Sequence, residues 1–515
     1  MYLLYSTAQI RAIEQAAAQA LPAGTLMTRA GRAGADCALA LLPGPGAKVL
    51  LLAGPGNNGG DALEVAAHLV AAGMRVSIWM AEDASPPASP SFERSAALAK
   101  ARQSQCHWIE DAAAADWDLI VDGLFGIGLQ RPIARRMRGI VEQVNELCQK
   151  LACPLLALDA PSGLDADTGA IVGQHGDAEV DGIAIFATHT ITFIGDKPGL
   201  HTCDGRDHAG IVTVARLDID AGHFPPAAAY LNGPDHFEHR LRARRHNTHK
   251  GSFGNVAVLG GAAGMTGAPI LAARSALFCG AGRVYIAFPD AAPAFDSGQP
   301  ELMCRQGDDV DFDAATLVAG PGLGGGDSAR RLLTRALGSG SALLIDADGL
   351  NLLASDAALQ AALAQRANIS VLTPHPLEAA RLLGIPASTV QSDRVAAASK
   401  LAQRYGAIVV LKGSGSVIAN PDGRIVINAT GNAALATAGT GDVLSGVCGA
   451  LLAQGWPAWE AALGAVWLHG KAADDLAAAG VGPIGLTAGE LIAAIRLAIN
   501  RLARRGIRPG DRPRS

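Results

Sequence analysis

Short apolar runs alternate with alanine-rich amphipathic stretches along the whole chain. In the first half the apolar runs are rich in leucine and β-branched residues and predict buried strands at 48–53, 75–80, 119–122 and 155–159. The amphipathic stretches between them predict helices at 61–72, 92–102 and 138–151. Strands that alternate with helices predict a doubly wound parallel sheet with helices on both faces. Such sheets bind ligands at the carboxyl ends of their strands.

The same rhythm restarts after a stretch rich in proline, alanine and basic residues. The later apolar runs predict strands at 255–260, 343–346, 369–373 and 408–412, and long helical segments follow from Gly441. A chain of 515 residues is also too long for a single core. We therefore expect two α/β domains, at 1–222 and 241–506, joined by a linker at 223–240 and followed by a basic tail at 507–515.

Basic side chains and histidines gather at 236–250, next to this linker. They permit a metal or nucleic-acid site, but Phe237 is the single aromatic residue among the charges up to Arg245, whereas many nucleic-acid sites interleave several. A solvated connector that touches an anionic ligand is the favoured interpretation.

Composition narrows the class of protein. Hydrophobic residues make up 49% and charged residues 17%, which is typical of large folded cores. The net charge of −5 gives no reason to expect nucleic acid or an anionic membrane as a partner. The eight cysteines include no CxxC pair, and neither a signal peptide nor a membrane span is predicted. We expect a cytoplasmic protein with reduced thiols.

Three strand ends in the first half carry polar side chains next to glycines. The first strand runs into GPGNNGGDA, the third ends at Asp122 in DGLFGIGLQRP, and the fourth ends at Asp159 in DAPSGLDADTG. Asparagine, aspartate and serine oxygens suit a hard cation or ribose hydroxyls. We expect Asn58, Asp122 and Ser162 to hold such a cation, which leaves Asp159 for acid–base chemistry. The alternative for each aspartate is a turn or a helix cap.

The most specific motif of the second half is ATAGTGDVLSG at 436–446, directly before an apolar helix. Gly439, Gly441 and the helix start predict an anion hole for phosphate. Asp442 lies at the same helix start, where it can accept the proton of a substrate hydroxyl. KGSGS at 412–416 and GPGLGGGD at 320–327 predict further ligand loops. His375 in TPHPLE, taken alone, is better explained as a packed loop histidine.

These motifs resemble those of the bifunctional NAD(P)H-hydrate repair enzymes. The first half resembles the epimerase domain through NNGGD, DGLFGIGL and PSGLDADTG. The second half resembles the ADP- or ATP-dependent dehydratase through HKGSFGNVAVLGGAAGMTGAP, GPGLG, TPHPLE and NATGNAALATAGTGD. The GTGD segment also resembles ribokinase-like folds in general. The resemblance implies a Rossmann-like epimerase domain followed by a ribokinase-like dehydratase domain.

The resemblance also implies roles for individual residues. Potassium would be bound by Asn58, Asp122 and Ser162. The hydrate in the epimerase would contact Asn57, Asn58, Gly59, Gly60, Asp61, Gly126, Ile127, Gly128, Leu129, Gln130, Arg131, Pro132 and Asp159. The hydrate in the dehydratase would contact Ala268, Gly322, His375 and Asp442. The nucleotide would contact Lys412, Gly413, Ser414, Gly415, Ser416 and Gly441.

Together these assignments predict two reactions on hydrated NADH or NADPH. Asp159 would serve the exchange of the R and S epimers at C6. Asp442 would serve dehydration of the S epimer with ADP or ATP as co-substrate and Mg²⁺ as the divalent ion. We also expect a homo-oligomer. The alternative hypothesis is a ribokinase-like small-molecule kinase whose first half is a non-catalytic ligand-binding or oligomerising module. The sequence alone does not distinguish ADP from ATP, or NADH from NADPH.

Overall fold

The computed structural model describes residues 2–81, 91–112, 116–174, 181–242 and 244–505, so the basic tail predicted at 507–515 lies outside the described residues. The chain forms two compact units. The N-terminal unit contains Leu3–Ala229 with Gln391–Asp393, and the C-terminal unit contains Met1–Tyr2, Tyr230–Val390 and Arg394–Ser515. Within the described ranges, no helix combines the length and the apolar character that crossing a membrane requires.

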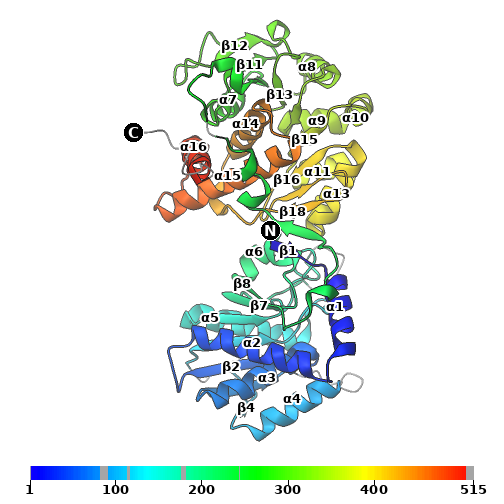
Figure 1. Ribbon diagram of the computed structural model, residues 1–515, viewed down its shortest axis with the longest axis vertical. Coiled ribbons are helices and arrows are strands. Elements are labelled where there is room, and N and C mark those ends of the chain that lie inside the picture. Colours follow the sequence, from blue (N-terminus) through cyan, green and yellow to red (C-terminus); the bar gives the residue numbers. More distant parts are fainter. Residues whose placement is uncertain (1, 82–90, 113–115, 175–180, 243, 506–515) are drawn as a thin grey trace. The chain divides into compact units, whose positions relative to one another are not determined.

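The N-terminal unit is built on a seven-stranded sheet in which every neighbouring pair is parallel (Figure 1). Its strands are β2 (Lys48–Ala53), β3 (Arg75–Met80), β4 (His107–Ile109), β5 (Leu119–Gly123), β6 (Leu155–Leu158), β7 (His189–Phe193) and β8 (Ile211–Ala215). Its helices are α1 (Thr7–Ala20), α2 (Thr25–Leu41), α3 (Asn57–Ala71), α4 (Phe92–Gln103), α5 (Arg135–Leu151) and α6 (Gly205–His208). The short strand β1 (Tyr2–Leu4) precedes α1.

Both faces of this sheet are buried, which explains its continuous apolar strands. Val49, Leu51 and Ala53 of β2 belong to one apolar core with side chains of α1 to α4. Leu50 and Leu52, which alternate with them, belong to a second core with side chains of α5. This alternation is the period of two that a strand imposes on its side chains. The doubly wound sheet predicted for the first half is therefore confirmed.

The strand order β4-β3-β2-β5-β6-β7-β8 places the functional loops. The chain runs from β2 to β4 toward one edge of the sheet, and from β5 to β8 toward the other. The order thus reverses between β2 and β5, and doubly wound sheets bind ligands at such a switch point. The loops that begin at Gly54 and Gly123 touch there, since the Gly54 amide donates to the Gly123 carbonyl at 3.0 Å.

The C-terminal unit contains a larger, mixed sheet in which β10 to β16 are parallel. Its strands are β9 (Ala229–Leu231), β10 (Asn255–Leu259), β11 (Arg283–Phe288), β12 (Met303–Gln306), β13 (Thr316–Ala319), β14 (Leu343–Ile345), β15 (Ser370–Leu372), β16 (Ile408–Leu411), β17 (Val417–Ala419) and β18 (Ile425–Ile427). Its helices are α7 (Gly267–Phe278), α8 (Asp327–Gly338), α9 (Ala347–Ser355), α10 (Ala357–Ala364), α11 (Pro376–Leu383), α12 (Ala387–Ser392), α13 (Arg394–Tyr405), α14 (Thr440–Ala453), α15 (Ala458–Ala478) and α16 (Ala488–Arg505).

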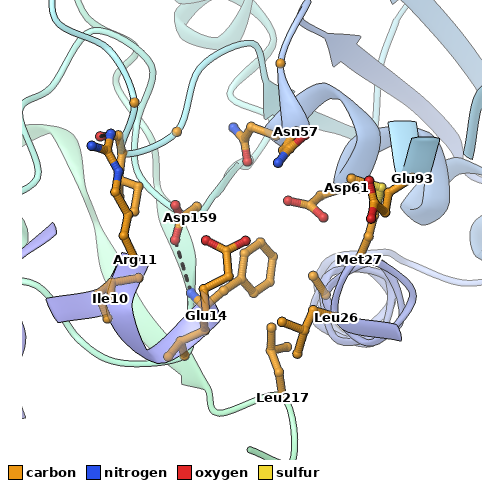
Figure 2. A pocket seen from close by; sticks show the side chains of 18 of the residues that line it. Ile10, Arg11, Glu14, Leu26, Met27, Asn57, Asp61, Glu93, Asp159 and Leu217 are labelled. Atoms are coloured by element: carbon orange, nitrogen blue, oxygen red, sulfur yellow. Dashed lines mark hydrogen bonds between the residues drawn. The ribbon is translucent and has the colours of Figure 1, made fainter. Parts of the chain in front are cut away.

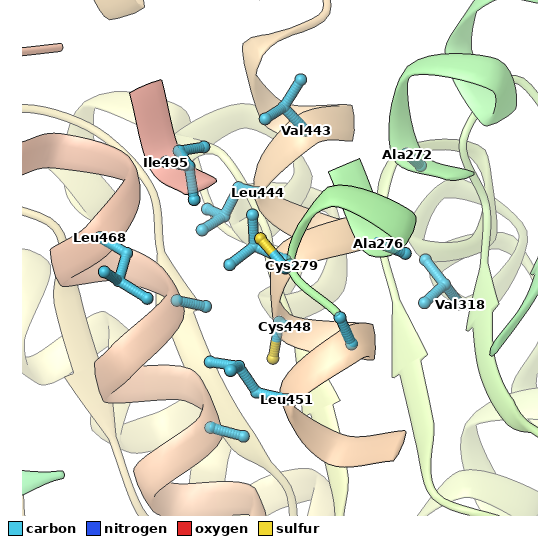
Figure 3. Close-up of a cluster of buried hydrophobic side chains, with 14 of the residues drawn as sticks. Ala272, Ala276, Cys279, Val318, Val443, Leu444, Cys448, Leu451, Leu468 and Ile495 are labelled. Atoms are coloured by element: carbon cyan, nitrogen blue, oxygen red, sulfur yellow. The ribbon is translucent and has the colours of Figure 1, made fainter. Parts of the chain in front are cut away.

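Helix α14 lies at the centre of the largest apolar core (Figure 3). Val443, Leu444 and Leu451 of α14 pack there with side chains of α7, α15 and α16. The helix also approaches α7 closely, because a Cβ added at Gly446 would lie 1.9 Å from the Ala272 carbonyl oxygen. This packing fixes the position of the α14 N-terminus, where Asp442 lies.

Several predicted bounds differ from the structure. The helix predicted from Asp61 begins at Asn57, so NNGGD forms its first turn and is not a loop before it. Asp61 therefore does not cap the helix start. The strand predicted to include Asp159 ends at Leu158, because Asp159 has a left-handed backbone with φ of 66°. The division between the units, at Ala229 and Tyr230, falls inside the predicted linker, which itself contains β9. The limits predicted for the domains stay a prediction.

Candidate functional sites

A buried carboxylate, a hydroxyl and an amide meet at the switch point of the N-terminal sheet. Asp122, which is 0% exposed, accepts hydrogen bonds from the Ser162 hydroxyl at 2.7 Å, the Ser162 amide at 2.8 Å and the Leu124 amide at 3.1 Å. Burial raises the pKa of Asp122 to about 6, against the lowering effect of these bonds. Asn58 is 7% exposed, and neither atom of its amide group has a hydrogen-bond partner in the described part of the chain.

A cation would complete this arrangement. Among the described residues no lysine or arginine pairs with Asp122, so the charge of its ionised form is balanced only by hydrogen bonds. Buried polar atoms without partners are rare, and the Asn58 carbonyl oxygen is one of them. The donor set of carboxylate, hydroxyl and amide oxygens suits a hard cation such as potassium.

Asp159 comes directly after β6, and one of its two carboxylate oxygens is hydrogen-bonded to the protein. Its Oδ1 accepts from the Lys197 ammonium at 2.8 Å and from the Phe193 amide at 3.3 Å. Lys197 is 0% exposed and also donates to the Thr192 hydroxyl and to two backbone carbonyls. The second oxygen faces the loop after β5, since a Cβ added at Gly126 would lie 3.1 Å from Asp159 Oδ2. The ammonium holds Oδ1, and Oδ2 is left for a ligand.

Asn58 and Asp159 both border one cavity of about 1050 Å³, formed within the N-terminal unit (Figure 2). Its walls include Asn57, Asn58, Asp61, Asp159 and the loop at 126–131. The pKa of Asp61 is raised well above its ordinary value by burial and then by the charge of Asp159. Among the residues predicted to contact the hydrate, Gly59, Gly60 and Pro132 do not line this cavity. A Cβ added at Gly59 would lie 2.0 Å from the Gly54 carbonyl oxygen, so that glycine serves a close contact between segments of backbone.

In the C-terminal unit, Asp442 is the third residue of α14, and Gly439 with φ of 88° precedes the helix. Burial and then the charge of Asp346 raise the pKa of Asp442 to about 6, while Lys412 lowers it. His469 donates from Nε2 to the Thr440 carbonyl at 2.9 Å and so supports this turn. Because burial lowers the pKa of His469 to about 4, the ring is neutral at neutral pH.

Lys412 lies beside this helix start. Its ammonium donates to Asp346 Oδ1 at 2.7 Å, and the other Asp346 oxygen accepts from the Ser445 hydroxyl of α14 at 2.7 Å. A Cβ added at Gly441 would lie 3.5 Å from Lys412 Nζ. The ends of β14 and β16 and the start of α14 therefore meet in one network, with a cation next to the backbone of Gly441.

The loop at 412–416 is shaped by a buried arginine. Arg394 donates to the carbonyls of Leu411 and Lys412, both at 3.2 Å. Gly413 has φ of 142°, and a Cβ there would lie 2.7 Å from the Arg394 guanidinium. Gly413 and Ser414 are exposed and Ser416 is half-buried, whereas Gly415 is buried. The Ser416 hydroxyl donates to the Gly413 carbonyl at 3.2 Å, which holds the loop together beside Lys412.

Two of the residues predicted to contact the hydrate in this unit lie together. A Cβ added at Gly322 would lie 3.3 Å from the Ala268 Cβ, at the switch point between β10 and β13. His375 has a structural role, because its Nδ1 accepts from the amides of Leu377 and Glu378 and caps α11. The proton of the neutral ring is therefore on Nε2, 3.4 Å from Glu378 Oε1.

Both halves of the chain match family models. Residues 23–199 match the model described as the YjeF-related protein N-terminus, and residues 256–496 match the model of NAD(P)H-hydrate dehydratase. The bifunctional NAD(P)H-hydrate repair enzyme of Coxiella burnetii is 35% identical over 97% of this chain and 100% of its own length. The chain belongs to the family of bifunctional NAD(P)H-hydrate repair enzymes.

Other relatives cover one half of the chain. The ADP-dependent (S)-NAD(P)H-hydrate dehydratase of Neisseria meningitidis is 46% identical over 52% of this chain and 92% of its own length. The ADP/ATP-dependent NAD(P)H-hydrate dehydratase of Bacillus subtilis, whose crystal contained ATP and Mg²⁺, is 29% identical, with a TM-score of 0.45 over 53% of this chain and 99% of its own. The C-terminal half has the α/β fold that was predicted for it, with a largely parallel sheet. Membership of the repair-enzyme family favours two enzymes on one chain over the kinase alternative.

Three polar residues of the sites in this family member were not predicted from the sequence. Lys197 comes four residues after β7. A charged residue soon after a predicted strand is the signal that could have marked it as a site residue. Asp346 is the last residue of the strand predicted at 343–346, and the sequence pattern predicts no site role for it. Glu14 lies on α1 and lines the cavity of the N-terminal unit. The sequence pattern of α1 offers no signal for Glu14, because a polar residue on an amphipathic helix is ordinary.

Proposed function

We propose that the two units carry out successive repair reactions on hydrated NADH or NADPH. The N-terminal unit interconverts the R and S epimers at C6. The C-terminal unit dehydrates the S epimer with ADP or ATP as co-substrate. The observation that carries the proposal is the position of Asp442, a carboxyl with a pKa of about 6 at a glycine-bounded helix start beside Lys412.

In the dehydration, Asp442 accepts the proton of the C6 hydroxyl. The oxygen attacks the terminal phosphorus of ADP, and the bond from that phosphorus to the bridging oxygen breaks, which releases AMP. The C6–O bond of the phosphate ester then breaks with its electron pair, while the lone pair of the ring nitrogen forms a double bond to C6. Loss of a proton from C5 restores the dihydropyridine. With ATP the nucleotide product is ADP.

The chain would stabilise the negative charge of this reaction from three sides. The N–H groups at the start of α14, including that of Gly441, face the phosphate. Lys412 supplies a positive charge, and Gly413, Ser414, Gly415 and Ser416 supply further contacts to the nucleotide. Ala268, Gly322 and His375 would contact the hydrate, with Nε2 of His375 as the available donor.

Mg²⁺ would neutralise phosphate charge in the C-terminal unit. Within the described residues, no group of three or more His, Cys, Asp or Glu side chains is arranged to hold a metal. This suits an ion that is bound largely through the nucleotide phosphates and water, as Mg²⁺ often is.

In the epimerisation, Asp159 exchanges a proton with the C6 oxygen through Oδ2. The hydrate would contact Asn57, Asn58, Asp61 and the loop at 126–131, which border the same cavity. Potassium would be held by Asn58, Asp122 and Ser162, where it would balance the buried Asp122 carboxylate and fix the α3 start against the loop after β5. We further propose a cytoplasmic homo-oligomer whose ligands are small molecules only.

Separated epimers test this proposal. With ADP and Mg²⁺, pure S hydrate should regain the near-ultraviolet absorbance of NADH and release one AMP and one phosphate for each NADH formed. Pure R hydrate should react at a rate set by the epimerisation. A stable phosphorylated hydrate as the end product would instead establish a kinase.

A further inference from the structure

A second carboxyl faces the epimerase cavity from a different wall. Glu14 lies on α1, whereas Asp159 lies at the end of β6, and the side chains of both line the cavity (Figure 2). Ile10 and Ile13 anchor α1 in the apolar core, which fixes the direction of Glu14. The Glu14 carboxyl makes no hydrogen bond or ion pair with the part of the chain that the structure describes. It is therefore available to a ligand.

Epimerisation at C6 has a stereochemical requirement that one carboxyl does not meet easily. The R and S hydrates carry the hydroxyl on opposite faces of the ring. The hydroxyl has to leave from one face as water, and water has to return to the other face. A proton donor is needed on the first face and a proton acceptor on the second.

We propose, building on the epimerase function proposed above, that Glu14 is a second catalytic residue and acts opposite Asp159 across the nicotinamide ring. In the R-to-S direction, one of the two carboxyls protonates the departing hydroxyl. The C6–O bond breaks with its electron pair going to oxygen, and the ring nitrogen lone pair forms the C6=N bond. Water then adds to the other face, the π electrons return to nitrogen, and the second carboxyl takes the proton from the added water.

The contacts of the two carboxyls favour Glu14 as the one that donates the first proton. Asp159 Oδ1 is already held by the Lys197 ammonium at 2.8 Å. Glu14 has no such partner among the described residues. Although Glu14 is exposed to solvent, desolvation of its carboxyl beside the cavity wall and then the charge of Asp159 raise its pKa, while Arg11 and Lys197 lower it. The charge of Glu93 also raises the pKa of Glu14. The charge of Glu14 in turn raises the pKa of Asp61.

After one turnover Glu14 has lost a proton and Asp159 has gained one. Protons return through water in the cavity, or the reverse reaction restores the starting state. The reaction needs no reductant, oxidant or nucleotide, because its net change is the inversion of C6.

The test follows R-to-S conversion by proton NMR without ADP. The wild-type chain is measured first, because a rate no faster than the spontaneous one would refute the epimerase function itself. Given an active wild type, Glu14→Gln should slow conversion by at least about 100-fold. Glu14→Asp should retain more of the rate. The matched control is Glu146→Gln on α5, which makes the same chemical change away from the cavity and should leave the rate unchanged.

The pH profile separates catalysis from a structural role. A general acid has to be protonated, so the wild-type rate should fall as the pH rises through the pKa of Glu14. The remaining rate of Glu14→Gln should lack that fall, while dehydration of S hydrate by the same variant stays normal. A Glu14→Gln rate within threefold of wild type would overturn the proposal. A slow variant that keeps the alkaline fall would overturn it as well, because the acid would then be another group.

Discussion

Asp442 has two neighbours with opposite effects on its proton affinity. Burial and the Asp346 carboxylate raise its pKa, and the Lys412 ammonium lowers it, with a result of about 6. A base of this kind is ionised at neutral pH yet binds a proton more strongly than an exposed aspartate does. Near neutral pH this combination favours proton transfer from a hydroxyl.

This pKa predicts the pH dependence of dehydration. In the proposed mechanism only ionised Asp442 accepts the hydroxyl proton, so kcat/KM for S hydrate should be constant above about pH 6 and fall about tenfold per pH unit below it. Initial rates with saturating ADP measure this, with enzyme-free blanks for acid decomposition of the hydrate. Samples returned from low to neutral pH should regain full activity, which excludes unfolding. A rate independent of pH between 5 and 7, a range of roughly one unit on either side of that pKa, would contradict the assignment.

At the scale of single elements, both sites depend on the loops and helix starts that come directly after parallel strands. The sequence predicted the strands before Asp122 and Lys412 and the helix after Gly441, because apolar runs bounded by glycine are strong local signals. It did not predict that α3 begins at Asn57, because NNGG has low helix propensity. In the structure Gly59 and Gly60 allow this helix start to pack closely against Gly54 and Met27. Lys197 and Glu14 were not assigned, because their roles arise from contacts distant in sequence. The local sequence pattern therefore predicts helices and strands. The contacts of Lys197 and Glu14 can be identified only in the folded structure.

The loop at 412–416 gives a prediction with an internal control. Gly413→Ala places a Cβ against the Arg394 guanidinium, so the loop has to move. Gly423→Ala also has a positive φ, of 94°, but nothing lies within 4 Å of its Cβ. Both substitutions should cost of order 1–3 kcal/mol of stability through backbone strain. Only Gly413→Ala should raise the KM for ADP, by about tenfold or about 1.4 kcal/mol. Equal KM values in the two variants would remove the loop from nucleotide binding.

The start of α3 gives a prediction about potassium. At constant ionic strength, replacing tetramethylammonium by potassium should raise the Tm of the N-terminal unit, by roughly 2–4 °C for each kcal/mol of binding free energy. Asn58→Ala should lose this response, because the amide is a proposed ligand. The variant should otherwise stay folded, since that amide makes no hydrogen bond with the residues that the structure describes. An undiminished potassium response in Asn58→Ala would place the cation elsewhere.

At the scale of the whole molecule, the two reactions belong to separate units with separate sheets and cores. Their activities should therefore complement each other between molecules. Asp159→Asn should dehydrate S hydrate but use R hydrate slowly, and Asp442→Asn should only epimerise. An equimolar mixture of the two variants should convert R hydrate to NADH with ADP. A mixture no faster than Asp159→Asn alone would show that both sites have to be intact on one chain.

The most direct test of the account is the dehydration of pure S hydrate by Asp442→Asn, followed as NADH absorbance together with AMP and phosphate release. We predict a loss of at least about 1000-fold in kcat. The variant should keep normal binding of ADP and the normal rate of R-to-S exchange, which show that both units are folded. Near-normal release of NADH and AMP by Asp442→Asn would contradict the central claim that this carboxylate activates the C6 hydroxyl.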